Sequence, residues 1–177
     1  MNHNETLRLL KALSFAADKH RFQRRKDTEE TPYINHPINV ALTLIETGNE
    51  DNNDLLVAAV LHDTIEDTQT TPEQLQEQFG KTIAAVVMEV TDDKNLPKAE
   101  RKRLQIVKAG SASRRARLVK LVDKICNLRD IASNPPAQWN LRRRRKYFDW
   151  AGQVIDNLRG THRRLERIFD KAYALRP

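Results

Sequence analysis

Residues 62–67 read His-Asp-Thr-Ile-Glu-Asp and place one imidazole and three carboxylates within six positions. They directly follow Leu55–Leu61, a run in which every residue is apolar. His62 and Glu66 are four residues apart, as are the two aspartates, so a continuous helix would carry both pairs in neighbouring rows at its end. Buried carboxylates are costly without positive charge nearby. The pattern therefore predicts a buried helix that ends in a cation-binding or proton-transferring site.

Two more residues elsewhere in the chain have side chains that ligate metals. His36 stands in the segment Tyr33–Pro37, and Asp123 stands in Leu121–Lys124. With the pair formed by His62 and Asp63 they give two imidazoles and two carboxylates from three predicted helices. That mixture suits one ion of intermediate hardness such as Mn²⁺, Fe²⁺ or Zn²⁺. Two simpler interpretations remain open at this point: a helix end that faces solvent, and a His36 that serves only as a cap.

The rest of the chain is predicted to be helical, and residues 1–177 are predicted to form a single all-α domain. Glycine and proline number only 5 and 7, and charged residues make up 31% of the sequence. Apolar residues recur at helical spacing and strand signals are almost absent. We expect helices over about 5–21, 37–47, 54–67, 72–80, 82–90 and 97–109, and two longer helical regions that begin near 114 and 137, the second interrupted near 160.

Three helix starts carry cap signals. Thr71, with proline next and Gln74 three residues on, predicts a capping box. Asn35 or His36 is expected to cap the helix that begins at Pro37, and Asn53 or Asp54 the apolar one. In the helix after Pro37 the expected buried face consists of Ile38, Ala41, Leu42 and Ile45.

The helix around Asp123 has an apolar face and an opposite charged stripe, which consists of Lys120, Asp123, Lys124, Asn127 and Asp130. A stripe of alternating charge is usually a helix face in contact with water. The alternative is that the stripe supplies the fourth metal ligand. The sequence leaves both interpretations open.

Composition restricts the class of protein. The net charge of +7 and the isoelectric point near 9.7 favour an anionic partner, either nucleic acid or a phosphorylated small molecule. A third interpretation is that the charge serves only solubility. The single cysteine, Cys126, excludes an internal disulfide and is expected to be a buried packing residue in a reducing compartment. No apolar run approaches the roughly 20 residues of a membrane helix, and no signal peptide is evident. These features predict a cytoplasmic protein without a membrane partner.

Five segments of the sequence form one ordered set of motifs: Arg24–Asp27, Thr31–Pro37, His62–Thr68, Val90–Lys94 and Leu121–Leu128. In this order and spacing they resemble the hydrolase domain of the RelA/SpoT alarmone enzymes. The likeness covers nearly the whole chain and is strongest to the stand-alone small alarmone hydrolases, which include a metazoan SpoT homologue. It implies an all-helical HD-domain bundle.

The resemblance also implies roles for individual residues. The metal ligands, for one Mn²⁺ ion, would be His36, His62, Asp63 and Asp123. The acidic pair that handles the attacking water would be Glu66 and Asp67. The substrate-binding positions would be Arg24, Lys26, Tyr33 and Asn127, together with Lys98, Arg101, Arg143 and Tyr147. The chain departs from the family pattern at Val122, Ile125 and Cys126, and we expect Cys126 to lie near the pocket and to bear on nucleotide choice.

The activity that the resemblance implies is metal-dependent hydrolysis of the 3′-pyrophosphate of ppGpp or pppGpp, giving GDP or GTP and pyrophosphate. Two alternatives keep the same metal chemistry and change the substrate to (p)ppApp or NADPH. A more distant alternative is a basic helical nucleic-acid-binding module. That module would bind with a steep salt dependence and would need no metal, but it leaves the histidine and aspartate set unexplained. The sequence leaves the oligomeric state open.

Overall fold

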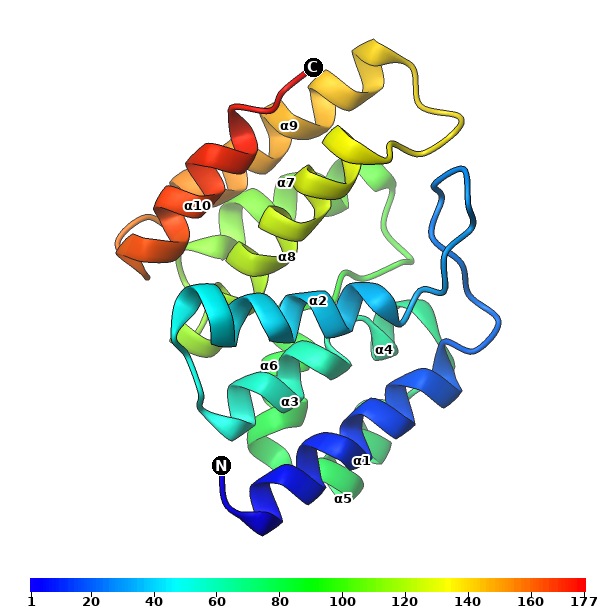
Figure 1. The fold of residues 1–177 in the computed structure, drawn as a ribbon, viewed down its shortest axis with the longest axis vertical. Helices are drawn as coiled ribbons and strands as arrows, with labels where there is room; N and C mark the ends of the chain where they lie inside the picture. Colours follow the sequence, from blue (N-terminus) through cyan, green and yellow to red (C-terminus); the bar gives the residue numbers. More distant parts are fainter.

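The computed structural model describes residues 1–177 and contains α-helices joined by short loops, as expected for an all-α protein (Figure 1). Backbone pairing of the β type is limited to one isolated bridge, between Arg24 and Pro32. The helices are α1 His3–Lys19, α2 Asn35–Thr43, α3 Asn53–Leu61, α4 Thr64–Asp67, α5 Pro72–Phe79, α6 Lys81–Val90, α7 Lys98–Ala109, α8 Arg114–Ser133, α9 Leu141–Asp156 and α10 Arg163–Tyr173, and a π-helical turn, η1 Leu44–Gly48, extends α2.

Helix α3 lies at the centre of the molecule. Residues Leu55–Leu61 are all buried, as their uninterrupted apolar sequence predicts. The helix packs against α1, α2, α6 and α8. One continuous cluster of 36 buried apolar residues reaches from α1 to α10, so the hydrophobic effect holds these helices in a single core.

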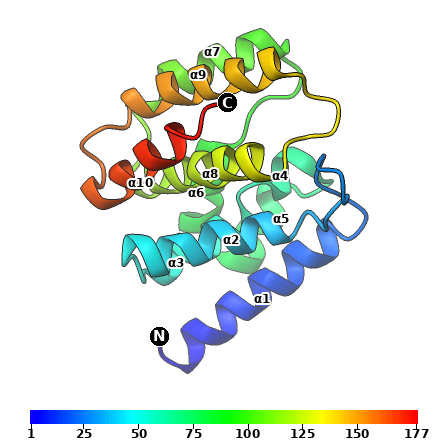
Figure 2. The same ribbon diagram turned by 45° about the horizontal axis from the view of Figure 1, so that its top comes forward.

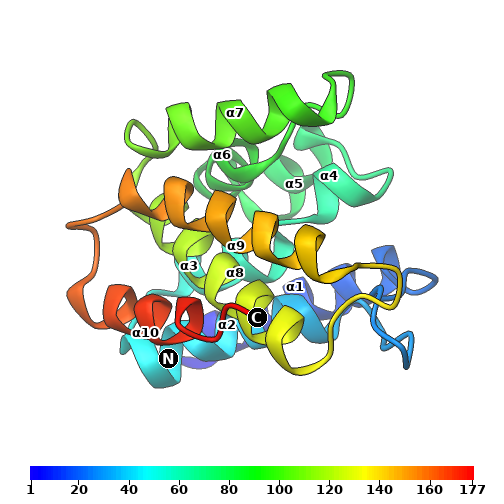
Figure 3. The ribbon, with the colours of Figure 1, turned by 90° about the horizontal axis from the view of Figure 1, so that it is seen from above.

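The helices are stacked along the long axis of the molecule. Helix α1 lies at one end, and α7 and α9 lie side by side at the other (Figure 2). Helix α8 runs between them and contacts α2, α6 and α10. Seen from above, α9 lies between α7 and α10 (Figure 3). None of the helices combines the length and the apolar character that crossing a bilayer would require.

Of the three predicted helix caps, one was confirmed and two were wrong. The capping box of α5 is present: the Thr71 side chain accepts from the Gln74 amide, and the Gln74 side chain accepts from the Thr71 amide. Helix α3 is instead capped by Asn52, one residue before the predicted candidates. Helix α2 has no side-chain cap, so the prediction of Asn35 or His36 was wrong. Its first turn is bounded by Ile34, in helical conformation, because the chain enters α2 from a tight turn rather than from extended backbone.

The predicted buried face of α2 was also wrong at three of its four positions. Ile38, Leu42 and Ile45 are 41, 44 and 38% exposed. The residues that face the core are His36, Val40, Ala41 and Leu44. His36, Val40 and Leu44 are spaced by four and form one row, so the rotation of α2 that brings His36 inward necessarily turns the competing apolar stripe outward.

The loop between α1 and α2 is ordered by its own hydrogen bonds. The Arg25 amide donates to the Thr31 carbonyl at 2.8 Å, and the Tyr33 amide donates to the Gln23 carbonyl at 3.1 Å. Asp27 closes the turn by accepting from the Thr31 amide and hydroxyl, bonds that lower its pKa. This loop contacts the segment between α8 and α9, where the Ala137 amide donates to the Lys26 carbonyl. The two segments therefore lie side by side (Figure 1).

Candidate metal centre and nucleotide pocket

The apolar helix does not continue through the acidic segment. Helix α3 ends at Leu61, and α4 begins at Thr64, so the predicted continuous helix is broken at His62 and Asp63. The Thr64 hydroxyl donates to the Leu61 carbonyl at 2.7 Å and stabilises the break. Because of this break, His62 and Asp63 leave the core helix at its end and Glu66 follows on a separate turn.

His62 is held in one orientation by the backbone. Its Nδ1 lies 2.7 Å from the Ala59 carbonyl, which can only accept, so Nδ1 carries the hydrogen. The opposite nitrogen, Nε2, is then a free lone pair directed into the site. This is the arrangement of metal-binding histidines, whose other ring nitrogen donates to a fixed acceptor.

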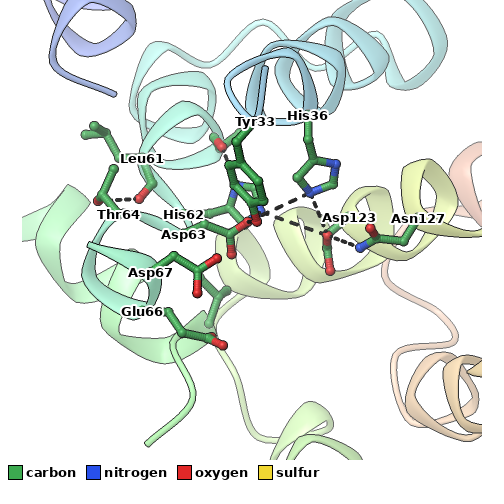
Figure 4. A network of polar contacts seen from close by, with 12 residues as sticks. Tyr33, His36, Leu61, His62, Asp63, Thr64, Glu66, Asp67, Asp123 and Asn127 are labelled. Carbon is green, nitrogen blue, oxygen red and sulfur yellow. Dashed lines mark hydrogen bonds and ion pairs between the residues drawn. The ribbon is translucent and has the colours of Figure 1, made fainter. Parts of the chain in front are cut away.

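Side chains from α2, the turn after α3, and α8 converge at one point (Figure 4). The ligating atoms of His36, His62 and Asp123 lie within 4.8 Å of one another. His36 Nε2 is 3.1 Å from Asp123 Oδ1, and His62 Nε2 is 3.0 Å from Asp63 Oδ2. Asp63 Oδ2 is also 3.9 Å from His36 Nε2. All four predicted ligands therefore meet, three as a compact group and Asp63 beside it.

The donor set fits a divalent cation. His62 Nε2 is buried and has no hydrogen-bond partner in the protein, although a carboxylate oxygen lies close to it. Burial acts to lower the pKa of His62, but the charge of Asp63 raises it to about 9. The electrostatic field of the carboxylates thus favours a positive charge where the imidazoles meet, and a metal ion supplies that charge without protonating the ligand.

Both aspartates also accept hydrogen bonds from neighbouring side chains. The Tyr33 hydroxyl donates to Asp63 Oδ2 at 2.6 Å. Asp123 accepts from Asn127 Nδ2 at 2.5 Å and from Lys124 Nζ at 2.8 Å. Burial opposes ionisation of Asp123, but Lys124 and His36 hold its pKa well below the usual value. Asp123 is therefore an anion at neutral pH.

Glu66 and Asp67 lie next to this group and differ in their contacts. Glu66 Oε2 accepts from the Asp92 amide at 3.0 Å, and burial raises the pKa of Glu66 to about 7. Asp67 accepts from Lys94 Nζ at 2.5 Å and from Gln23 Nε2 at 3.0 Å. A carboxyl that titrates near neutral pH beside a metal site has the pKa expected of a general base.

A second cavity of about 310 Å³ adjoins the metal centre. The cavity at the metal centre, about 160 Å³, shares Tyr33, Asp67 and Asn127 with it. Among the predicted substrate-binding residues, Arg24, Lys26, Tyr33, Asn127 and Tyr147 line this second cavity. Its walls also include Trp139, so the cavity offers cations and flat aromatic surfaces together.

The remaining predicted substrate-binding residues line a third cavity, between α7 and α9. Lys98, Arg101 and Arg143 are there, and Tyr147 and Trp139 belong to both this cavity and the second one. The Arg101 Nε is buried without a protein partner. The first turn of α9 also holds several arginines and no acidic residue, although the positive end of a helix favours anions. This surface is therefore suited to phosphate groups.

Cys126 lies outside these three cavities, which corrects the expectation that it borders the pocket. Its thiol is buried between α8 and α2, 3.7 Å from the Thr43 hydroxyl, and burial raises its pKa to about 12. The cysteine is thus a packing residue, as its apolar surroundings in the sequence predicted.

Sequence reasoning missed several residues of the site. Arg25 donates to Asn127 and Asp130 at 3.1 and 2.7 Å and lies over the Tyr33 ring. Lys120 and Lys124 are only 7 and 6% exposed, so the charged stripe of α8 is not the wet face that such a pattern usually indicates. Burial lowers the pKa of Lys120 to about 8. The sequence offered one signal for these lysines: they stand in the same stripe as Asp123, a predicted metal ligand.

Comparison with known proteins assigns the family. The HD domain family matches residues 12–147. The guanosine-3′,5′-bis(diphosphate) 3′-pyrophosphohydrolase MESH1 of Danio rerio is 50% identical over 98% of this chain and 96% of its own length. The protein of that name from Homo sapiens is 50% identical over 98% and 97%.

A solved structure agrees with these sequences. The structure described as a metazoan ortholog of SpoT that hydrolyses ppGpp has a TM-score of 0.93 and 48% identity, over 96% of this chain and 95% of that one. The HD-domain match also implies a divalent metal ion, for which His36, His62 and Asp123 are grouped here. By sequence and fold, the chain belongs to the HD-domain family, among the MESH1-type 3′-pyrophosphohydrolases.

Proposed function

We propose that this chain removes pyrophosphate from the 3′ position of ppGpp and pppGpp and so releases GDP or GTP. The observation that carries the proposal is the junction, through Tyr33, Asp67 and Asn127, of the metal centre with a cavity that offers both cations and aromatic rings. Such a paired site fits a substrate with a reacting phosphate at one end and a nucleoside at the other. The names of relatives that are 50% identical over nearly their full length support the same activity.

In this proposal residues 1–177 act as one phosphohydrolase domain with one bound ion. His36, His62, Asp63 and Asp123 would hold that ion, which we propose to be Mn²⁺, with Fe²⁺ and Zn²⁺ as alternatives that accept the same mixture of nitrogen and oxygen donors. When bound, such an ion lowers the pKa of water at the site and offsets charge on the phosphates. The continuous core and the contacts of α10 with α8 support the single domain.

The two acidic residues would orient the attacking water and accept its proton. Glu66, whose pKa is raised to about 7 by burial, exists in both forms near neutral pH and can accept that proton. Asp67 lies on the same turn and helps to orient the water. In the overall reaction water supplies hydroxyl to the phosphorus, the bond between phosphorus and O3′ breaks, and O3′ receives a proton. Pyrophosphate then leaves as the second product.

The cationic residues would bind the substrate and stabilise the negative charge of its phosphates. Arg24 and Lys26 would contact the nucleotide in the second cavity, and the Tyr147 and Trp139 rings provide surfaces on which a base can stack. Lys98, Arg101 and Arg143 would contact the remaining phosphates. These roles account for the net charge of +7 through a small nucleotide, with no need for a nucleic-acid partner.

The test is pyrophosphate release from purified, metal-depleted protein after Mn²⁺ is restored, with ppGpp, ppApp and NADPH measured in parallel. We expect Mn²⁺-dependent pyrophosphate from ppGpp. Faster turnover of ppApp, or phosphate released from NADPH, would retain the metal centre and overturn the choice of substrate. Inactivity on all three, with salt-sensitive binding to nucleic acid, would contradict the proposal as a whole.

A further inference from the structure

Asp67 is held by partners on both of its carboxylate oxygens. Lys94 Nζ lies 2.5 Å from Oδ1, and Gln23 Nε2 lies 3.0 Å from Oδ2. The two partners come from different parts of the chain: Lys94 from the loop between α6 and α7, and Gln23 from the loop after α1. The Lys94 side chain is half exposed, so water screens its attraction to Asp67. Gln23 is the better-fixed partner.

The amide of Gln23 has only one orientation that satisfies both of its neighbours. A carboxylate accepts hydrogen bonds, so the NH₂ group of Gln23 must face Asp67. The amide oxygen, Oε1, then faces His20 Nδ1 at a distance of 2.6 Å. His20 Nδ1 must therefore carry a hydrogen and donate it. The order of donors and acceptors is fixed from His20 through Gln23 to Asp67.

The position of His20 is fixed by its burial at the end of α1. It follows the last residue of α1, is only 2% exposed, and its backbone amide donates to the Ala16 carbonyl. Its ring lies 4.9 Å from that of Tyr33, centroid to centroid. A buried imidazole is costly unless its hydrogen bonds are used, and the metal centre makes no use of this one. The contact with Gln23 is its only side-chain hydrogen bond, because its Nε2 is buried without a protein partner.

We propose that Gln23 is a positioning residue for the reaction, and that His20 fixes its amide so that Asp67 is held toward the attacking water. The inference rests on the proposed function, because it assigns Asp67 to the orientation of that water. Gln23 also lines the second cavity, so the same side chain lies between the nucleotide pocket and the acidic pair.

The first variant is Gln23→Met, which keeps the length of the side chain and removes both hydrogen bonds. We expect kcat for ppGpp to fall by about 10- to 100-fold, the range for loss of an orienting partner behind a reacting group. KM and the Mn²⁺ dissociation constant should change far less, since no metal or phosphate contact is removed. Gln76→Met, an exposed glutamine of α5, is the matched control and should behave as the wild type.

The second pair of variants tests His20. His20→Leu removes the donor and should lower kcat as Gln23→Met does. His20→Asn places an amide NH₂ close to the position of Nδ1, so it should recover most of the lost kcat. Recovery in His20→Asn distinguishes positioning from simple packing, because leucine fills the volume without donating. Melting temperatures of all four variants show which of them fold.

The outcomes separate this inference from the function on which it rests. A wild-type protein that releases no pyrophosphate from ppGpp contradicts the proposed function. An active wild type with unchanged kcat in folded Gln23→Met overturns the positioning role alone. A folded Gln23→Met variant that loses Mn²⁺ affinity in proportion to kcat also overturns it, because the effect would then lie in the metal centre.

Discussion

Glu66 and Asp67 are neighbours on α4, but their hydrogen-bond partners differ. Glu66 is partly buried, and a single backbone amide, from Asp92, faces its carboxylate. Asp67 is engaged on both oxygens. Loss of a general base lowers turnover by roughly 10²- to 10⁴-fold. We therefore expect Glu66→Gln to lose most of its kcat while Mn²⁺ content, measured by metal analysis, stays near that of the wild type. Normal turnover in this variant would remove Glu66 from its role.

The raised pKa of Glu66 predicts how the rate depends on pH. Burial raises this pKa to about 7, and only the ionised carboxylate can accept a proton. The rate should therefore increase as pH rises through the neutral range and level off above it. Steady-state kcat at saturating Mn²⁺ and ppGpp, measured across this range, gives the profile. The residual activity of Glu66→Gln is the control and should lack this rise; a rise of equal size in both proteins assigns the titration to another group.

Asp123 gives a separate test of the metal centre. Asp123→Asn keeps the shape of the side chain and removes its negative charge, so the variant should retain Mn²⁺ at least about tenfold more weakly. Equilibrium dialysis of the purified protein measures this directly. Asp149→Asn is the matched control, because Asp149 pairs with Arg176 on the surface. Equal Mn²⁺ affinity in Asp123→Asn and the wild type would exclude Asp123 from the ligands.

At the level of residues, the sequence predicted the side chains whose type is characteristic of metal binding. It missed polar side chains whose contacts form only in the folded chain. His36, His62 and Asp123 were predicted from residue type and helix context, and the structure brings them together. Gln23 and Arg25 were not singled out, because an amide or a cation in a polar loop has no spacing signal. Their contacts depend on how the loop after α1 folds over α4 and α8.

At the level of elements, local signals predicted the start of α5, where a capping box is present, and placed the cap of α3 one residue too late. Thr71 is the cap residue of α5. Thr71→Ala removes an N-cap and should lower the free energy of unfolding by about 1 kcal/mol, with kcat of the folded protein unchanged. Denaturant unfolding measures the loss. Thr82→Ala, at an exposed position early in α6 with no cap bond, is the control and should be near neutral.

Tertiary packing determined the rotation and the ends of those helices for which local sequence signals were insufficient. The rotation of α2 was mispredicted because both of its stripes are apolar, and only the need to bury His36 selects one. The π-helical turn η1 extends the same helix with a changed register. The break between α3 and α4 follows from the bond of Thr64 to the Leu61 carbonyl, whereas the apolar run alone favours continuation.

At the level of the whole molecule, the fold brings distant segments to one end of the central helix. The two imidazoles come from α2 and the end of α3, Asp123 comes from α8, and the cations come from the first loop, α7 and α9. The acidic metal centre shares Tyr33, Asp67 and Asn127 with the second cavity, whose lining mixes cations and carboxylates, and it shares Gln105 with the more cationic third cavity. A basic composition predicted an anionic partner, but only the fold shows that the cations surround one site.

Because the positive charges lie around one site, we expect salt to lower the rate at which the protein binds its substrate, and not the rate of the chemical step. A protein of charge +7 attracts a polyphosphorylated nucleotide over a distance that falls from about 30 Å at 0.01 M salt to about 8 Å at 0.15 M. With Mn²⁺ saturating, kcat/KM for ppGpp should fall several-fold over this range while kcat stays nearly constant. Arg24→Gln should flatten the dependence, since it removes a charge from the cavity wall. Arg163→Gln, exposed on α10, should have a smaller effect. An equal flattening by both variants would mean that overall net charge, and not the cavity, governs capture.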